Sequence, residues 1–556
     1  REFGMVMAGT VAISAFLALS LTPMVSTKLL KAEKSQTWFY RKTEVFFQKL
    51  NATYKNGLDT FLKHRHYAFV IIIASLALIF LLWIIIPAEM APLEDRSQIT
   101  INTSAAEGAT YEFMLAYADD IADLVEKNVP ERLGHTTMVR GGSFANIRIN
   151  LVKPDERERS QQEIADQLAY LVRTKTKARA FVVQQSTFAQ RRSGMPVQYV
   201  LQATSIDKLR EIIPAFMTRV SESEVLQMAD VNLKFTKPEL RIHINREKAI
   251  TMGVSTQNIG QTLQLALSGQ RFGYFFMNGK QYQILGELAR ENRNKPLDLK
   301  SLYVRNNNGE MIQLDNLVTL SEETAPPQLY RYNRFVAATI SAGLAKGKTI
   351  SEGIDEMDRI AREVLDESFR TALAGDSKDF MESSSSLMFA FALALILIFL
   401  VLAAQFESFK DPFIVMMTVP LALTGALIFM WYFNITMNIF SQIGLIMLIG
   451  LVSKNGILLV EFANQRKLSG MTKLEAIKVA AATRFRPILM TSLATIFGLL
   501  PLALGLGDGA QSRIAMGTTV VGGMLFSTFL TLFVVPAIYT YISSEIKQND
   551  DGITHD

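Results

Sequence analysis

Seven long apolar stretches constrain this chain more than any other feature of its sequence. Each has about the 20 residues that an α-helix needs to cross the hydrocarbon core of a bilayer. A backbone in lipid must satisfy its own hydrogen bonds, so we expect a multi-pass α-helical membrane protein with seven spans. The stretches cover residues 4–27, 67–88, 383–406, 412–433, 438–460, 487–507 and 514–544.

The composition indicates a second, soluble part. Hydrophobic residues make up 49% of the 556 residues and charged residues 20%, which is too many charges for a chain buried wholly in a membrane. The sequence has no cysteine, which excludes disulfide bonds and thiolate metal sites. The Lys and Arg clusters flank the apolar stretches, so we expect no nucleic-acid partner.

Basic loops predict the orientation of the spans. Residues 28–66 carry nine Lys or Arg side chains against three Asp or Glu, and residues 461–486 are also basic. Short basic loops stay in the cytoplasm, and alternate threading puts both of these loops on one side. Residues 89–382 then lie on the outer side, and so does the start of the chain at Arg1. Because no signal peptide precedes the first span, we interpret the chain as part of a longer protein.

The outer region is predicted to be mixed α+β. Strand-like alternation and helical spacing follow each other at intervals of a few tens of residues, which suggests duplicated strand–helix–strand subdomains. The candidate strands are residues 97–103, 145–152 and 197–203, and the candidate helices are residues 111–127, 161–174 and 207–220. Asn278-Gly279 between apolar and aromatic flanks is a strong hairpin signal. It predicts an inserted β-rich lobe at about residues 256–330.

Lys454 is the only charged residue between residues 412 and 460. A charge inside a span costs roughly 2.5–3.5 kcal/mol on insertion scales, so it usually has a partner and often lies on an ion path. A lysine that reaches to the membrane surface is the simpler alternative. A membrane-anchored binding or sensing module would need no such charge, so Lys454 favours a transporter. The chain has no hydrolase or nucleotide-binding motif, and we expect no enzyme.

Four short motifs carry a resemblance to a known family. They are residues 404–409 (AQFESF), 450–455 (GLVSKN), 460–463 (VEFA) and 486–492 (RPILMTS). With them, nearly the whole chain resembles the C-terminal half of a resistance–nodulation–division efflux permease of the hydrophobe/amphiphile exporter branch. The resemblance implies that the spans correspond to the sixth to twelfth helices of that family.

The resemblance also implies a domain layout. It comprises a first span at residues 1–27, a basic cytoplasmic linker at 28–66 and a second span at 67–88. Residues 89–195 and 196–382 would be periplasmic porter subdomains, the second with the inserted docking lobe. A five-helix membrane block would follow at residues 383–544, and a cytoplasmic tail at 545–556.

Function and partners follow from the same resemblance. Such permeases are homotrimers in the bacterial inner membrane, and they export amphiphilic drugs, dyes, detergents or bile salts. They work with a periplasmic adaptor protein and an outer-membrane channel. The proton gradient drives them, and no cofactor is implied. A metal-ion or lipid exporter of the same superfamily is the alternative.

The proton relay of the family matches Lys454, Asn455, Arg484 and Thr491. The simpler interpretation of Arg484 is a flanking charge, and that of Thr491 is a hydroxyl bonded to its own helix. The titrating acids of the family are two aspartates in its fourth helix, which this chain lacks. The spans offer no buried Asp or Glu in their place, so we expect that the chain alone does not pump.

Phe144, Arg148 and Tyr199 are candidate substrate contacts. Family pockets are aromatic and apolar with few polar groups, which suits loosely specific binding. Phe144 and Tyr199 are equally compatible with an ordinary core, and Arg148 with a solvated strand. The 24 methionines raise a metal-export hypothesis, but they show no repeated ligand spacing, and His135 and His243 are isolated. We therefore predict no metal site.

Overall fold

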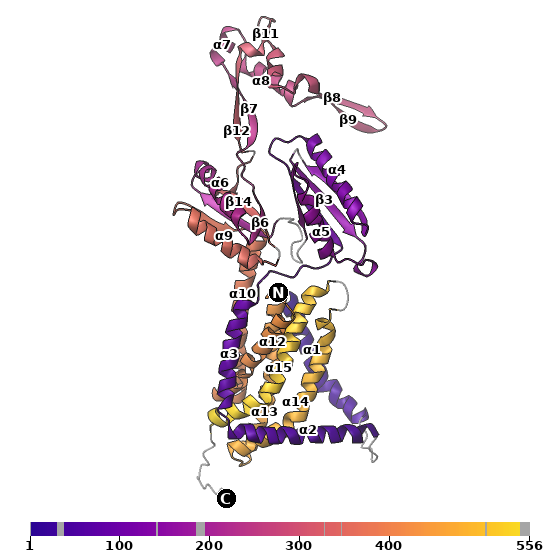
Figure 1. Ribbon diagram of the computed structural model, residues 1–556, viewed down its shortest axis with the longest axis vertical. Coiled ribbons are helices and arrows are strands. Elements are labelled where there is room, and N and C mark those ends of the chain that lie inside the picture. The colour runs from indigo at the N-terminus through magenta and orange to yellow at the C-terminus, as the bar shows by residue number, and fades with distance from the viewer. Residues whose placement is uncertain are drawn as a thin grey trace.

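The structure is a computed structural model of an elongated molecule (Figure 1). It describes residues 2–29, 38–140, 143–184, 195–326, 328–345, 347–505 and 509–544. A helical bundle forms one end, two α+β units follow it, and a β-rich lobe forms the far end (Figure 1). The predicted cytoplasmic tail at residues 545–556 lies outside the described residues.

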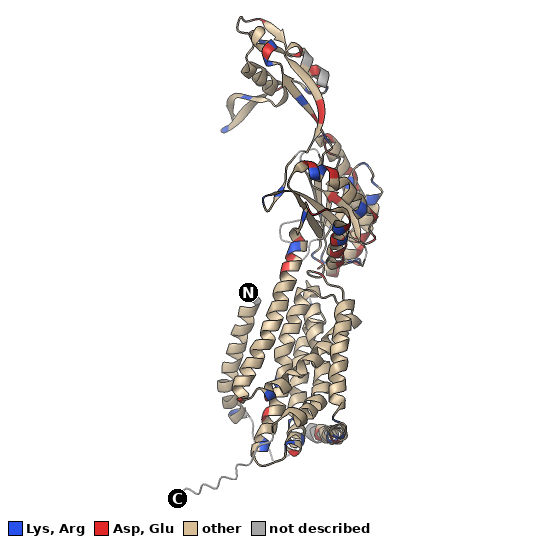
Figure 2. Cartoon of the chain, turned by 90° about the vertical axis from the view of Figure 1, so that its left-hand side faces the viewer, with Lys and Arg blue, Asp and Glu red and all other residues tan. Residues whose placement is uncertain are grey.

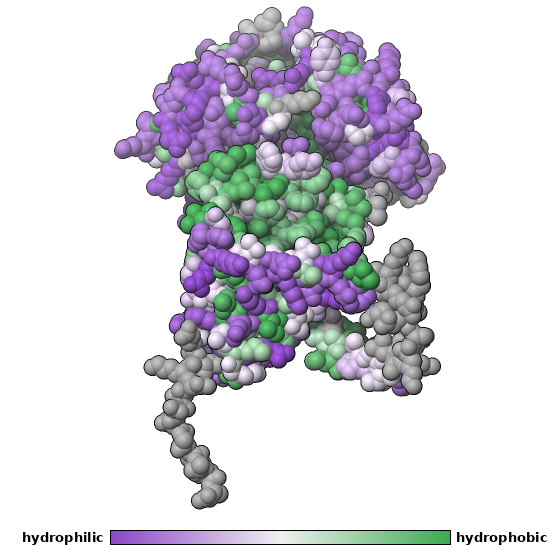
Figure 3. Space-filling view, turned by 60° about the horizontal axis from the view of Figure 1, so that its bottom comes forward, coloured by the Kyte–Doolittle hydropathy of each residue, from purple (hydrophilic) through white to green (hydrophobic). Residues whose placement is uncertain are grey.

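The prediction of seven helices that can span a membrane is confirmed in the described chain. On the face drawn in Figure 3, an apolar belt crosses the bundle between two hydrophilic zones. The fourth span is divided at Met417 into α11 and α12. The span helices are α1 (Glu2–Leu29), α3 (Tyr67–Ile85), α10 (Gly375–Phe406), α11 (Lys410–Met416), α12 (Thr418–Tyr432), α13 (Ile439–Leu468), α14 (Lys473–Ala503) and α15 (Ala510–Ile542).

Three of these helices extend by eight or more residues beyond the apolar stretches that predicted them. The span expected at residues 383–406 belongs to a helix that starts at Gly375, and α13 continues past Val460 to Leu468. The span expected at residues 487–507 belongs to α14, which begins at Lys473 behind a capping box formed by Thr472 and Glu475. Hydropathy marks the lipid-facing length of a helix, whereas caps mark where the helix begins.

Helix α2 (Trp38–Lys63) occupies the segment that the sequence indicated only as a linker. It lies across the end of the bundle that points away from the α+β units, which we call the basic end (Figure 1). Tyr54, Leu58 and Leu62 are buried against the bundle, and the Tyr54 hydroxyl donates to the Leu532 carbonyl at 2.7 Å. Its apolar stripe is too narrow for a span, but it suits a helix lying on a surface.

The first α+β unit is a four-stranded antiparallel sheet with the order β2-β3-β1-β4. Ile99 pairs with Ile149 and Ile101 with Ile147, and all four side chains are fully buried. The elements are β1 (Gln98–Ser104), α4 (Tyr111–Asn128), β2 (Arg132–Arg140), β3 (Phe144–Leu151), α5 (Gln161–Arg173) and β4 (Arg179–Val183).

The second α+β unit holds a five-stranded sheet. Its main path is β13-β14-β5-β15, and β6 also pairs with β14. Both units thus place their first strand between the last strand and a later one, but the second sheet has the additional short strand β13. The elements are β5 (Val197–Ala203), α6 (Ile206–Glu222), β6 (Leu226–Val231), β13 (Arg331–Tyr332), β14 (Phe335–Leu344), α9 (Ile350–Val364) and β15 (Arg370–Leu373).

The lobe is inserted between β6 and β14. Its stem is the antiparallel pair β7 (Lys237–Ile244) and β12 (Val318–Ala325), so it runs from 237 to 325 rather than from about 256 to 330. The predicted hairpin is present, because Asn278 and Gly279 turn with φ of 52° and 72° between β8 (Gln270–Met277) and β9 (Lys280–Gly286). The other elements are α7 (Arg246–Thr251), α8 (Thr256–Leu267), β10 (Tyr303–Arg305), β11 (Met311–Gln313) and short 3₁₀ turns.

A short segment after α3 ties the bundle to the first α+β unit. The Met437 amide donates to the Pro87 carbonyl at 2.8 Å, and the Glu89 amide donates to the Met437 carbonyl at 3.0 Å. The Thr436 hydroxyl also donates to the Glu89 carboxylate. These bonds hold the segment against the start of α13, the helix that carries Lys454.

Candidate functional site

Lys454 lies on α13 and faces α14. Its Nζ donates to the Thr495 hydroxyl at 3.3 Å, and the side chain is half-buried. Figure 2 shows that the spans are nearly free of charged residues, which gather toward the basic end. Within the described residues, Lys454 forms no ion pair. Among the described residues, one hydroxyl is thus the only hydrogen-bond partner of an ammonium that has three protons to donate.

Asn455 is fully buried beside Lys454. Its Nδ2 donates to the Ser492 hydroxyl at 3.2 Å, whereas its Oδ1 has no hydrogen-bond partner among the described residues. A buried polar atom without a partner costs about 1–3 kcal/mol. The pair of contacts from Lys454 and Asn455 defines a polar seam between α13 and α14.

Arg484 lies on α14 about two turns nearer the basic end than Ser492 and about three turns nearer than Thr495. Its guanidinium carbon is 4.6 Å from the centre of the Phe462 ring, and its buried Nε has no described hydrogen-bond partner. The ring face of Phe462 is a weak substitute for a carboxylate, because a cation–π contact contributes about 0.5–2 kcal/mol. Arg484 is therefore held by α13, but no described acid neutralises it.

Thr491 does not contact Lys454. Its hydroxyl donates to the Ile488 carbonyl of its own helix at 3.1 Å. The hydroxyl that meets Lys454 belongs to Thr495, one turn further along α14, and Ser492 meets Asn455. Sequence reasoning missed both residues, although the i, i+4 spacing of Thr491 and Thr495 places them on one face.

Several acids lie near the ends of the span helices, and one of them has a hydrogen-bond network of its own. Asp411, which directly precedes the stretch predicted at 412–433, belongs to α11 and is half-buried. Its carboxylate accepts from Asn464 Nδ2 at 3.0 Å, and Asn464 Oδ1 accepts from the Tyr539 hydroxyl at 2.7 Å. Asn464 is ten residues from Lys454 on α13, about 15 Å along the helix, so this acid serves a separate network.

The sequence model of the AcrB/AcrD/AcrF family matches residues 1–543 of the chain. The chain belongs to this family of resistance–nodulation–division permeases. An uncharacterized transporter of Haemophilus influenzae is 31% identical over 562 residues, which cover 98% of the chain and 54% of that protein. The chain thus spans about half the length of the curated relative it matches. Family and relative both indicate a multi-pass membrane transporter rather than an enzyme.

The three candidate substrate contacts of this permease chain do not come together. Phe144 and Arg148 are exposed on one face of β3, and Ala145 and Ile147 between them are buried. Tyr199 is 1% exposed in the core of the second unit, where its hydroxyl donates to Asp358 at 2.7 Å. In this conformation Tyr199 offers no surface to a substrate.

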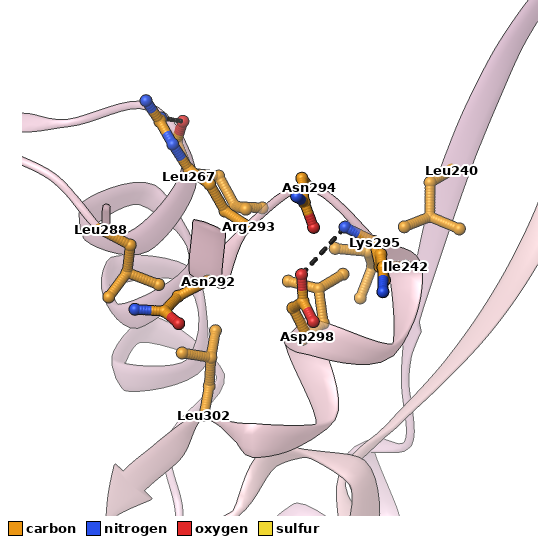
Figure 4. A pocket seen from close by; sticks show the side chains of 11 residues that line it. Leu240, Ile242, Leu267, Leu288, Asn292, Arg293, Asn294, Lys295, Asp298 and Leu302 are labelled. Atoms are coloured by element: carbon orange, nitrogen blue, oxygen red, sulfur yellow. Dashed lines mark hydrogen bonds between the residues drawn. The ribbon is translucent and has the colours of Figure 1, made fainter. Parts of the chain in front are cut away.

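The permease chain has two notable hollows, both remote from Lys454. One of about 250 Å³ lies in the lobe, where the Arg293 guanidinium donates to the Leu267 carbonyl and the Lys295 amide to Asp298 (Figure 4). The other, of about 440 Å³, lies where the two α+β units meet and is lined by Arg179 of the first unit and Met217 of the second. The described residues hold no group of three or more metal-binding side chains.

Proposed function

We propose that this chain is the C-terminal half of a proton-driven permease that exports amphiphilic compounds. The observation that carries the proposal is the set of incompletely partnered polar groups between α13 and α14. Lys454 has one hydroxyl contact, and Asn455 Oδ1 and Arg484 Nε have no hydrogen-bond partner among the described residues. Such groups are costly in a membrane, and intramembrane cations are characteristic of ion and proton pathways.

A protonatable carboxylate would convert this seam into a switch. When ionised, the carboxylate would pair with Lys454 and draw α13 toward it. When protonated, it would release the ammonium, which would return to the Thr495 hydroxyl. Breaking a buried ion pair costs several kcal/mol of free energy, which is enough to shift the equilibrium between two arrangements of the helices.

The carboxylate is expected in the half of the transporter that this chain does not cover. The Haemophilus influenzae relative is nearly twice as long as the matched region, which leaves room for a second set of helices. We therefore expect no transport by the chain alone, and transport when it is joined to the other half.

Movement of α13 can reach the α+β units through the segment after α3. Met437 and Thr436 at the start of α13 hold Glu89, and five residues later Glu94 accepts from the Ser512 hydroxyl at the start of α15. Asp95 then pairs with Arg157 of the first α+β unit. This chain of contacts supports coupling between the seam and the outer region.

Substrate would be handled in the periplasm, where the hollow between the two α+β units offers an entry site. Arg148 and Phe144 on the exposed face of β3 would supply a cation and an aromatic ring. The lobe would meet the adaptor protein and outer-membrane channel in a homotrimer. Its β8–β9 hairpin exposes Phe272, Phe276 and Leu285 at 63%, 77% and 68%, and large exposed apolar side chains favour protein contacts.

The test is dye efflux from cells that carry the intact transporter with Lys454→Ala. Lys467→Ala is the matched control, because Lys467 lies on the same helix but donates to Ser543 at the basic end. We expect efflux to fall to the level of cells without the transporter for Lys454→Ala and to stay near wild type for Lys467→Ala. Normal efflux by a well-expressed Lys454→Ala variant would refute the proposal.

A further inference from the structure

The corner between α2 and α3 gathers basic side chains at the edge of the bundle. Lys63, His64, Arg65 and His66 are consecutive and all exposed. The corner lies at the basic end, where α2 leaves the surface of the bundle and α3 enters the predicted span (Figure 1). Two cations and two imidazoles in sequence thus form a compact exposed polar surface at the end of the predicted span.

The chain itself does not neutralise this corner. The two acids among the described side chains of α2 have other partners, because Glu44 pairs with Arg486 at 2.9 Å and Asp59 with Lys478 at 2.7 Å. Among the described residues, no carboxylate lies within ion-pair distance of Lys63 or Arg65. The positive charge of the corner is therefore available to an external anion.

Aromatic rings hold Arg65 in place. Its guanidinium carbon lies 4.5 Å from the centre of the Tyr541 ring, and its Nη1 donates to the Thr540 hydroxyl at 3.4 Å. Tyr541 packs in turn against Phe69, with ring centres 5.2 Å apart. A guanidinium that rests on a ring keeps its other N–H groups free, and its planar fork matches the geometry of a phosphate.

An apolar strip continues directly from the corner along α3. Phe69, Val70 and Ile73 are 42%, 56% and 67% exposed, and with His66 they follow the i, i+3, i+4, i+7 spacing of one helix face. A cationic end next to an exposed aliphatic strip matches the two parts of a phospholipid. Tyr67 and Tyr541 add the aromatic rings that are common at the membrane–water interface.

We propose that this corner binds the phosphate headgroup of an anionic phospholipid, whose acyl chain lies along the α3 strip. Arg65 would hold the phosphate in its fork, Lys63 would add a second positive charge, and the two histidines would offer polar ring nitrogens beside it. Because the charged corner adjoins an exposed apolar strip on the predicted span α3, a phospholipid fits this surface better than a soluble anion does. This site is independent of the transport chemistry at Lys454.

The test is retention of phosphatidylglycerol by the intact, purified transporter, measured by native mass spectrometry after titration with phosphatidylglycerol or phosphatidylcholine. The test variant is Lys63→Gln with Arg65→Gln. Lys49→Gln with Lys55→Gln is the matched control, because it removes the same charge from exposed positions elsewhere on α2. Loss of a direct hydrogen bond between a charged side chain and the phosphate weakens binding by at least about tenfold, so we expect at least roughly tenfold weaker retention in the test variant.

Each outcome bears on the proposal. Loss in the test variant, with the control within about twofold of wild type, supports it. Equal losses in both variants would show diffuse attraction and overturn it, as would equal retention of phosphatidylcholine. Competition by millimolar inorganic phosphate would indicate a general anion site and overturn the proposal, and so would absence of bound phosphatidylglycerol from the wild type. If the double variant unfolds, Tyr541→Leu, which removes the support of Arg65, should still weaken retention.

Discussion

Two cations of the molecule, Arg157, whose side chain is buried, and Lys454, which is half-buried, have contrasting surroundings. Arg157 in the first α+β unit has a side chain only 1% exposed, faces the carboxylate of Asp95 and donates to the Arg159 carbonyl at 2.8 Å. Lys454 between α13 and α14 has a single hydroxyl contact at 3.3 Å. A cation paired with a carboxylate stabilises one structure, whereas a cation without a carboxylate can bind a partner in one state of the transporter and release it in another. The contrast distinguishes a structural charge from a functional one.

The surroundings of Asp95 support its structural role. Its two carboxylate oxygens accept from the Ser97 amide and the Gln161 amide, each at 3.1 Å. The Gln161 side chain accepts in turn from the Arg96 and Gln98 amides, each at 3.0 Å. No comparable set of bonds surrounds Lys454 among the described residues.

Removal of the Asp95 carboxylate should produce the largest loss of stability. Asp95→Ala leaves Arg157 buried without an anion, which costs about 3–5 kcal/mol. Unfolding of the purified transporter in denaturant, followed by hydrogen exchange in residues 98–183, measures the effect. Replacing the pair by Leu at 95 and Met at 157 should recover most of the loss. If the Asp95→Ala variant were as stable as wild type, the Asp95–Arg157 ion pair would not contribute to the stability of the fold.

Removal of the Lys454 charge should have the opposite sign. In the chain without the other half, Lys454→Met eliminates a poorly compensated charge from the span, so the melting temperature should stay level or rise by an amount equivalent to about 1 kcal/mol. Transport by the intact transporter should nevertheless be lost. A thermal scan in detergent beside a dye-efflux assay gives both values. A destabilised variant would place Lys454 in the same structural class as Arg157.

Loss of the Thr495 hydroxyl should have a smaller effect. Thr495→Val removes the one described partner of Lys454, which corresponds to about 1 kcal/mol and a several-fold fall in transport rate. Thr491→Val is the control, because the Thr491 hydroxyl bonds only to its own helix in this conformation. Equal effects of the two changes would restore Thr491 to the role that the sequence predicted.

The smallest effect concerns Glu89 at the junction. Burial raises the pKa of Glu89, and the hydrogen bond from Thr436 only partly opposes this. The neutral acid is therefore favoured in the folded state. The stability that neutral Glu89 contributes to the folded state is complete when the pH is below the ordinary pKa of 4.5. It is lost as the pH rises through the raised pKa of the folded state. Glu89→Gln should match wild type in acid and melt at a higher temperature near neutral pH. If the difference in melting temperature between Glu89→Gln and wild type did not change with pH, the raised pKa of Glu89 would be contradicted.

The spans and the hairpin could be predicted from the sequence because both depend on local signals. Seven apolar stretches predict the number of membrane spans, and Asn278-Gly279 predicts the turn between β8 and β9. Helix α2 was missed because only one face of it is apolar, and that face needs the bundle to cover it. The start of α14 was missed because the capping box at Thr472 lies outside the apolar stretch.

The site could be predicted only in part. Lys454 stands out because it is alone, and Asn455 follows it, but a hydroxyl partner on another helix depends on how the two helices rotate against each other. That rotation selects Thr495 rather than Thr491 and brings Ser492 to Asn455. Tyr199 could not be placed by alternation alone, because both faces of β5 are largely buried.

Proton flux tests the central claim most directly. The intact transporter, reconstituted in vesicles that contain a pH-sensitive dye, would be given an imposed proton gradient and an amphiphilic substrate. We predict substrate-dependent proton movement by the wild type and by Lys467→Ala, and none above leakage by Lys454→Ala. Undiminished substrate-dependent proton movement by Lys454→Ala would contradict the account of Lys454 as the switchable cation of the transporter.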